Sequence, residues 1–238
     1  MIGIIKSDNR YKELSKVVDA IYSDKLIDFY DIDTLILPIK GIDNDGNILI
    51  NLNLEDIIKN NSIKKIITGK SNNRLKEICK DNSIKLIELF SDPSFVKDNA
   101  RLTALGIFSY LLDNKKLDKP ITIIGFGNIS FYLALILSLN KIKFNIYTLN
   151  PIEIKFIELL GYNYSDNIYE DNLLINTIPK NLDWDYQLIN NKYILDVSSA
   201  PYGFDILKLD KSNKYEILSN IPAIFYPYEA MKLILTRI

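Results

Sequence analysis

The 238-residue sequence contains no histidine and only one cysteine, Cys79. Without histidine the usual zinc-ligand sets are incomplete, so we predict no metal site. Nucleophile pairs that depend on a histidine base are excluded as well, and an acid or base in this chain must be Asp, Glu, Lys, Tyr or Cys. A single cysteine cannot form an internal disulfide, so we expect the protein to work in a reducing cytosol.

A charge imbalance and long apolar runs are also missing. Lys and Arg total 29 against 30 Asp and Glu, and no basic cluster appears, so the electrostatic footprint of a nucleic-acid-binding protein is absent. No run approaches the roughly 20 apolar residues of a membrane helix. The short apolar start, Met1–Lys6, is typical of a first β-strand rather than of a signal peptide. We therefore predict neither a nucleic-acid partner nor a membrane partner.

Short apolar runs alternate with helical patterns along the chain, which is typical of βαβ units and mainly parallel sheets. The predicted strands are Ile2–Ile5, Asp33–Ile39, Lys64–Thr68, Lys85–Leu89, Ile121–Ile124, Lys143–Thr148, Asn172–Thr177, Tyr193–Ser198 and Tyr215–Leu218. The predicted helices are Arg10–Ala20, Leu54–Asn60, Asn73–Lys80, Pro93–Leu112, Asn128–Leu139, Pro151–Leu160 and Tyr226–Ile238.

This pattern predicts a two-domain α/β protein, because the length exceeds that of a common single domain. We expect residues 1–112 to form an N-terminal α/β domain with a parallel sheet, ending in an interdomain helix. Residues 113–238 are predicted to form a C-terminal Rossmann-like NAD(P)-binding domain.

The most specific motif is Gly125-Phe126-Gly127, which falls between a predicted strand and a predicted helix. In a dinucleotide fold the first glycine permits the tight turn and the second lets the backbone approach the pyrophosphate. The third glycine is replaced by Ser130, a small residue. The helix that follows would offer free N–H groups to phosphates. The alternative is a tight strand-to-helix turn that binds nothing.

Three further strand ends are expected at the same edge of the sheet. Tyr147–Asn150 lacks both the Asp or Glu that bonds a ribose hydroxyl and the Arg that accompanies a 2′-phosphate, so the choice between NADP and NAD stays open. Asn150 could bond a ribose hydroxyl or only cap the next helix. The predicted cofactor-binding residues are Gly125, Phe126, Gly127, Asn128, Ile129, Ser130, Thr148, Leu149, Asn150, Thr177, Ile178 and Pro179. Asp196 ends a later strand and is the best-placed ionisable group of this half.

Several short motifs follow one another along nearly the whole chain. They are Ser7–Arg10, Leu37–Pro38, Asn44–Gly46, Thr68–Asn72, Leu89–Phe90, Asn99–Gly106, Gly125–Gly127, Asn176–Pro179, Ile194–Asp196, Pro201 and Gly203. Together they resemble the A subunit of dipicolinate synthase, the two-subunit enzyme that makes the spore chelator dipicolinic acid. Five positions depart from the family pattern: Leu105 stands for Glu, Leu149 for Arg, Ala200 for a basic residue, Tyr202 for Gly and Tyr228 for Lys.

The resemblance implies a pyridine-nucleotide-dependent oxidation of a lysine-pathway dihydro- or hydroxytetrahydrodipicolinate to dipicolinic acid during sporulation. It also implies the mother-cell cytoplasm as the location and a partner, the flavoprotein-like B subunit, while a homo-oligomer stays possible. The residues that would bind the dicarboxylate across an interdomain cleft are Arg10, Lys40, Lys70, Asn99 and Thr103. The catalytic group is open, with Asp196, Lys70 and Tyr228 as candidates.

Two other functions remain open. A catalytically degenerate homologue could keep the fold and serve as a scaffold or regulatory subunit, as the replacements Leu105, Leu149 and Tyr228 would favour. The retained Gly125 and Gly127 favour the enzyme instead. A dehydrogenase of the same two-domain plan could act on an amino or keto acid, although without histidine it would lack the usual acid/base group of hydroxy-acid enzymes.

Overall fold

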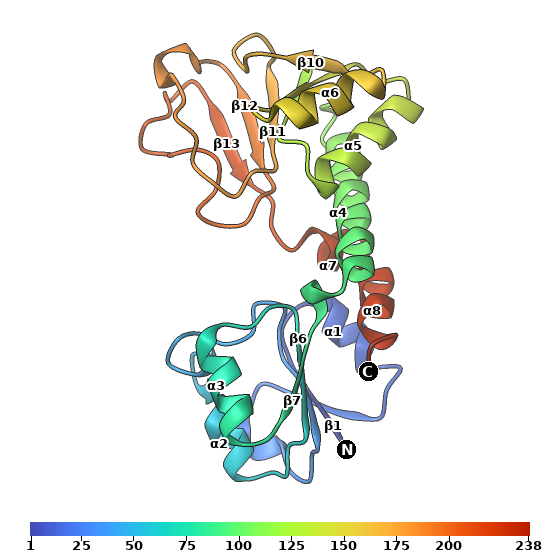
Figure 1. The fold of residues 1–238 in the computed structure, drawn as a ribbon, viewed down its shortest axis with the longest axis vertical. Coiled ribbons are helices and arrows are strands. Elements are labelled where there is room, and N and C mark those ends of the chain that lie inside the picture. The colour runs from blue at the N-terminus through green and yellow to red at the C-terminus, as the bar shows by residue number, and fades with distance from the viewer. The chain divides into compact units, whose positions relative to one another are not determined.

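A computed structural model describes residues 1–238, which form two compact units (Figure 1). The first unit contains Met1–Asn99 together with Pro222–Ile238, and the second contains Ala100–Ile221. The division differs from the sequence-based one, because the long helix α4 (Pro93–Asp113) contributes to both units and the C-terminal residues return to the first.

The first unit is built on a five-stranded parallel sheet in the order β2-β1-β3-β6-β7. Its strands are β1 (Ile2–Ile5), β2 (Ala20–Ser23), β3 (Thr34–Ile36), β6 (Lys65–Thr68) and β7 (Lys85–Glu88). Between β3 and β6 lies a small antiparallel hairpin, β4 (Asn47–Leu49) and β5 (Leu52–Asn53). Short 3-10 turns occur at η1 (Leu26–Asp28) and η2 (Leu89–Ser91).

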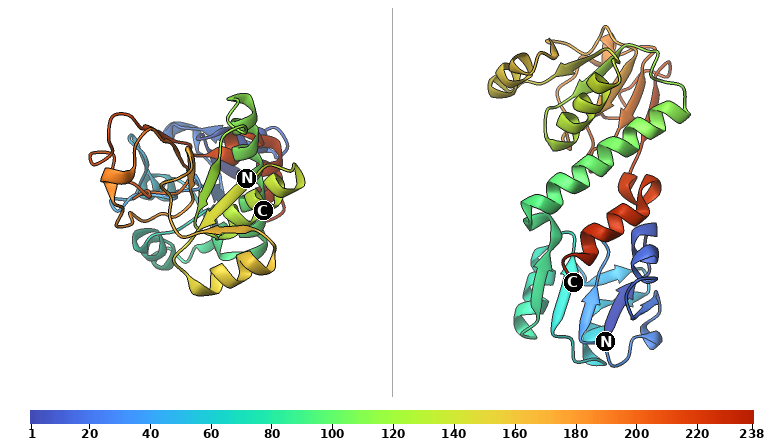
Figure 2. Two further views of the ribbon diagram at one scale, coloured as in Figure 1. Left: turned by 90° about the horizontal axis from the view of Figure 1, so that it is seen from above. Right: turned by 90° about the vertical axis from the view of Figure 1, so that its right-hand side faces the viewer.

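Successive strand residues point to opposite faces of this sheet, as the pleat requires. Ile5 packs in a buried cluster with residues of α2 (Leu54–Lys59) and α3 (Asn73–Asp81). Ile4 packs on the other face with residues of α1 (Asn9–Leu14), the start of α4 and α8 (Pro227–Leu235). Figures 1 and 2 show α8 alongside α1. The C-terminal residues therefore complete the core of the first unit.

The second unit carries a six-stranded parallel sheet in the order β10-β9-β8-β11-β12-β13. Its strands are β8 (Ile121–Ile124), β9 (Phe144–Tyr147), β10 (Asn163–Ser165), β11 (Leu173–Asn176), β12 (Tyr193–Asp196) and β13 (Lys214–Ile217). In chain order this is 3-2-1-4-5-6, the strand order of dinucleotide-binding folds. The predicted fold class, two parallel α/β units with the second Rossmann-like, is confirmed.

Helices α5 (Asn128–Leu139) and α6 (Pro151–Leu159) connect the first three strands of the second sheet, and α7 (Ile221–Phe225) begins at the last residue of the unit. The opposite face of the sheet is covered by loops and η3 (Tyr186–Leu188). There Trp184 stacks on Phe204 with ring centroids 5.3 Å apart, and its Nε1 donates to Gly203 O at 2.8 Å. A helix with the length and the apolar composition of a membrane span is absent from the chain.

Some predicted boundaries are wrong. The helix predicted over Arg10–Ala20 ends at Leu14, and Ala20 instead begins β2, which pairs with β1. Residues 15–17 form turns and Val17 is 51% exposed, so the helical spacing of the apolar residues here does not mark a buried helix face. The strand β10 and the β4–β5 hairpin were not predicted, because strands of two or three residues carry too little alternation to be recognised.

Candidate functional site

The glycine turn lies between β8 and α5, at the carboxyl edge of the second sheet. The strand order reverses there between β8 and β11, which is where open α/β sheets bind ligands. Gly125 has a φ of +92°, and a Cβ on it would stand 2.7 Å from Ile178 Cγ1. Both the backbone conformation and the close approach of Ile178 therefore require glycine at this position.

Gly127 differs, because nothing in the fold requires it. Its φ of −81° and ψ of −168° suit any residue, and a Cβ on it would meet no atom within 4 Å. It is the N-cap residue of α5 and provides no side-chain cap for the first N–H groups of that helix. The residues present thus fit a pyrophosphate group, because space stays open in front of uncapped N–H donors and the positive end of a 12-residue helix.

Ser130, in place of the third glycine, is fully buried and is held by hydrogen bonds. Its hydroxyl lies 2.7 Å from Thr177 Oγ1, and Thr177 Oγ1 donates to Ile124 O at 2.8 Å. The ends of β8 and β11 are thereby tied to the first turn of α5. These bonds account for the departure from glycine, since the polar atom of Ser130 is satisfied within the fold.

The end of β9 brings together Thr148, Leu149 and Asn150, the second predicted cofactor segment. The side chain of Leu149 is 69% exposed. Asn150 caps α6, because its Oδ1 accepts from Ile152 N at 3.0 Å. Glu153, which was not among the predicted residues, folds back onto this end of the strand: Thr148 Oγ1 donates to Glu153 Oε2 at 2.5 Å. An Asn followed three residues later by Glu is the spacing of a capping box and could have revealed it.

Asp196, predicted as a catalytic candidate, is fully buried and serves the fold. Its carboxylate accepts from Ser198 N at 3.0 Å, Ser198 Oγ at 2.7 Å, Gly203 N at 2.9 Å and Tyr215 Oη at 3.0 Å. A carboxylate offers about four acceptor sites, so these donors fill it. Asp196 therefore anchors the loop after β12. Its carboxylate has no acceptor site left for a substrate proton.

Three predicted substrate residues of the first unit follow neighbouring strands: Arg10 follows β1, Lys40 follows β3 and Lys70 follows β6. Arg10 is 4% exposed, and its Nε donates to Asp8 Oδ1 at 2.9 Å. Lys40 and Lys70 are exposed, and Lys70 Nζ lies 5.3 Å from the centre of the Phe90 ring. Their loops are joined, since Lys70 N donates to Ile39 O at 3.0 Å. The structure thus brings the lysine-bearing loops together at one sheet edge.

The remaining candidates lie on helices. Asn99 and Thr103 are one turn apart on α4, with Asn99 half-buried and Thr103 buried. Tyr228 is in the first turn of α8, is 48% exposed, and has the Lys232 ammonium 4.4 Å above its ring. Lys70 and Tyr228 belong to the first unit and Asp196 to the second.

No protein-family model and no curated protein sequence matches the chain. Solved structures do. The dipicolinate synthase A protein from Bacillus halodurans is 18% identical, with a TM-score of 0.80 over 99% of this chain and 95% of that one. Its counterpart from Bacillus subtilis is 18% identical, with a TM-score of 0.75 over 99% and 93%. The chain has the fold of the dipicolinate synthase A proteins. Salmonella D-lactate dehydrogenase shares it more distantly, at 13% identity and a TM-score of 0.67 over 99% and 94%.

The resemblance to dipicolinate synthase A indicated by the motifs is thus confirmed at the level of fold. One departure from the family motifs has a structural consequence. Tyr202, where the family pattern has glycine, adopts a φ of +68°. The left-handed region costs a residue with a Cβ roughly 1–2 kcal/mol, so this loop keeps a conformation suited to glycine although the glycine is gone.

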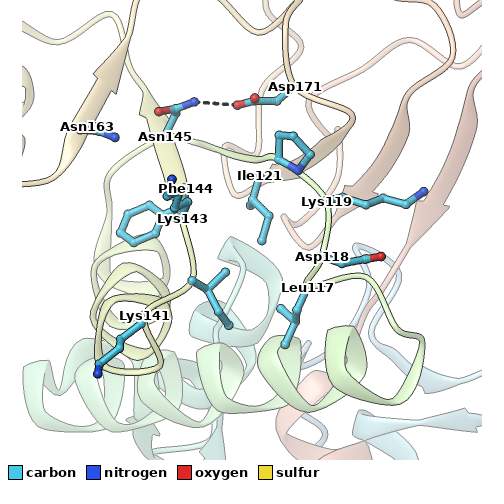
Figure 3. Close-up of a pocket in the computed structure, with 12 residues that line it drawn as sticks. Leu117, Asp118, Lys119, Ile121, Lys141, Lys143, Phe144, Asn145, Asn163 and Asp171 are labelled. Atoms are coloured by element: carbon cyan, nitrogen blue, oxygen red, sulfur yellow. Dashed lines mark hydrogen bonds between the residues drawn. The ribbon is translucent and has the colours of Figure 1, made fainter.

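A separate hollow of about 520 Å³ opens at the amino ends of β8, β9 and β10, the edge opposite the glycine turn (Figure 3). Two polar groups at its wall are bonded to one another, since Asn145 Nδ2 donates to Asp171 Oδ2 at 2.8 Å, and Thr122 Oγ1, behind the wall, donates to the same oxygen. Figure 3 shows Lys119 and Lys141 pointing away from one another. The hollow therefore lacks the convergent polar groups of a binding site.

Proposed function

We propose that this chain is a pyridine-nucleotide-dependent oxidoreductase subunit of the dipicolinate synthase type. Its substrate is a dihydrodipicolinate, which loses a hydride to the nicotinamide and a proton to a base or solvent and so becomes the aromatic dipicolinate. A hydroxytetrahydrodipicolinate first loses water. The reaction takes place during sporulation in the mother-cell cytoplasm, and the partner is a flavoprotein-like B subunit.

The observation that carries this proposal is the unexplained glycine at position 127. Gly125 is explained by its φ and by Ile178, whereas a side chain at Gly127 would enter open space at the N-terminus of α5. Glycine is also accepted as an N-cap residue, but a turn that binds nothing would favour Ser, Asp or Asn, whose side chains cap the free N–H groups of the helix. The 3-2-1-4-5-6 strand order brings this turn to the ligand-binding edge of the sheet and adds support.

The nucleotide would be held by the residues after β8, β9 and β11. The uncapped N–H groups at the start of α5 bind the pyrophosphate, and the segments Thr148–Asn150 and Thr177–Pro179 lie after the strands on either side of β8. When bound, the nicotinamide supplies the hydride acceptor. The chain shares its fold with Salmonella D-lactate dehydrogenase, and this likeness supports dehydrogenase chemistry.

The dicarboxylate needs cations or N–H donors for two carboxylates. Arg10 suits this role best among the predicted residues, because only its Nε is bonded to Asp8 and its terminal amino groups remain for a bidentate contact. Lys40 and Lys70 are exposed at the ends of the neighbouring strands β3 and β6 and would supply further positive charge. Asn99 and Thr103 complete the proposed set.

Turnover is tested by incubating the purified chain with dihydrodipicolinate, NAD⁺ or NADP⁺ and the B subunit, and following dipicolinate by mass spectrometry. The proposal expects dipicolinate and reduced nucleotide in equal amounts. Arg10→Lys keeps a charge but loses the bidentate fork, so KM should rise by about tenfold or more. The matched control is Arg74→Lys, because the Arg74 side chain pairs with Glu55 on the surface.

The alternative is a scaffold or regulatory subunit without turnover. The saturated carboxylate of Asp196 favours it, as do Leu149 and Tyr228 in place of the family's cations. Nucleotide binding without any dipicolinate in the complete mixture would support this alternative. Formation of dipicolinate would exclude it.

A further inference from the structure

Glu153 fixes a carboxylate at the end of β9 although no acidic residue stands in the strand end itself. It is the third residue of α6, after the N-cap Asn150, and its side chain turns back toward the strand. Oε2 accepts from Thr148 Oγ1 at 2.5 Å and Oε1 from Asn150 Nδ2 at 3.4 Å. The carboxylate is half-buried and held at two points.

The charge of this carboxylate is not neutralised by its partners. Thr148 and Asn150, the two side chains bonded to Glu153, are both neutral, and the basic residues nearest in sequence are Lys143 and Lys155. The position in the first turn of α6 favours a negative charge through the helix dipole. The Glu153 carboxylate therefore places a negative charge at the end of β9.

In dinucleotide folds the end of the second strand, about 20 residues after the glycine turn, meets the adenosine ribose. A carboxylate there accepts a hydrogen bond from the 2′-hydroxyl of NAD. The 2′-phosphate of NADP has no hydrogen to donate and carries negative charge, so the same carboxylate repels it. Leu149, where the family pattern has arginine, offers no counter-charge.

We propose that Glu153 makes this site select NAD(H) over NADP(H). The inference rests on the proposed nucleotide site and adds its specificity. The selecting acid comes from the helix that follows the strand, and it takes the place that an acidic residue at the strand end holds in other dinucleotide folds. Thr148 and Asn150 position the acid.

The test is calorimetric titration of the purified full chain with NADH and with NADPH, for the native protein, Glu153→Gln and Glu158→Gln. Gln also suits the third position of a capped helix, so Glu153→Gln should fold. Glu158 is exposed on the same helix and serves as the control. Thermal melts of the three proteins verify that they are folded.

The native protein should bind NADH about tenfold or more tightly than NADPH, a difference that one like-charge contact can supply. Glu153→Gln should reduce this ratio toward one, mainly by tightening NADPH binding, and Glu158→Gln should leave it unchanged. If both nucleotides bind but NADPH binds at least as tightly as NADH, or if Glu153→Gln keeps the native ratio, the inference on Glu153 is overturned and the proposed function stands. If neither nucleotide binds, both are overturned.

Discussion

Gly203 lies directly against the side-chain amide of Asn176, since a Cβ on Gly203 would stand 2.3 Å from Asn176 Nδ2. Asn176 is fully buried, donates to Ile178 O at 3.0 Å and accepts from Ile178 N at 3.2 Å. Asp196 holds Gly203 in place through the Gly203 N–H. The loop after β12 thereby shapes the turn after β11, which in turn packs against Gly125.

Gly203→Ala should destabilise the protein by about 1–3 kcal/mol, the usual cost of forcing an extra group into a packed site. The clash would displace Asn176 from its hydrogen bonds with Ile178. Urea unfolding followed by circular dichroism measures the change, with Ser199→Ala, an exposed position in the same loop, as the control. An unchanged unfolding midpoint would show that Asn176 moves aside freely and that the contact does not constrain the loop.

The two glycines of the turn should respond differently to alanine. Gly125→Ala should cost about 1–2 kcal/mol for the left-handed backbone alone, and the contact with Ile178 adds to it. Gly127→Ala should change stability by less than about 0.5 kcal/mol, because the lower entropy of the unfolded chain and the poorer helix cap offset one another. Equal destabilisation of the two variants in urea unfolding would mean that position 127 is packed after all.

Asp92 should make the first unit sensitive to acid. The Arg237 guanidinium and the Ser94 N–H lower the pKa of Asp92 from 3.8 to about 2. Arg237 Nε donates to Asp92 Oδ2 at 2.7 Å, which links the start of α4 to the C-terminal residues. Because the pKa is lower in the folded protein, the stabilisation is fully present above about pH 4 and is lost as the pH falls toward 2.

Urea unfolding at several pH values between about 5 and about 2 measures this loss. Asp92→Asn should flatten the pH dependence over that window, whereas Asp113→Asn, an exposed aspartate at the other end of α4, should retain it. An identical pH dependence in the native protein and Asp92→Asn would contradict the role given to the Asp92–Arg237 pair.

The sequence predicted best where the signals are local. The strand, glycine turn and helix from Ile121 to Leu139 were predicted with the bounds that β8 and α5 have, because turn glycines and hydrophobic runs act over a few residues. The sequence does not predict that α8 belongs to the first unit. The apolar stripe of α8 could pack on either sheet, and the order of the elements along the chain favours the sheet of the second unit.

The sequence also does not predict the side-chain contacts between loops. The sequence offers Asp196 as the best-placed ionisable group of the second half, but its donors come from Ser198, Gly203 and Tyr215, whose approach depends on the folded loop. The position of Glu153 is hidden in the sequence for the converse reason. It is separated from the strand end in sequence and reaches it only because α6 begins with a tight cap at Asn150.

The central claim is that the open space at Gly127 holds the pyrophosphate of a nicotinamide dinucleotide. Calorimetric titration of the native protein and of Gly127→Val with NADH tests it most directly, with a thermal melt to verify that the variant is folded. We expect saturable binding by the native protein and its loss in Gly127→Val, because a branched side chain fills the space in front of α5. No binding by the native protein at millimolar NADH, or equal binding by the folded variant, would contradict the claim.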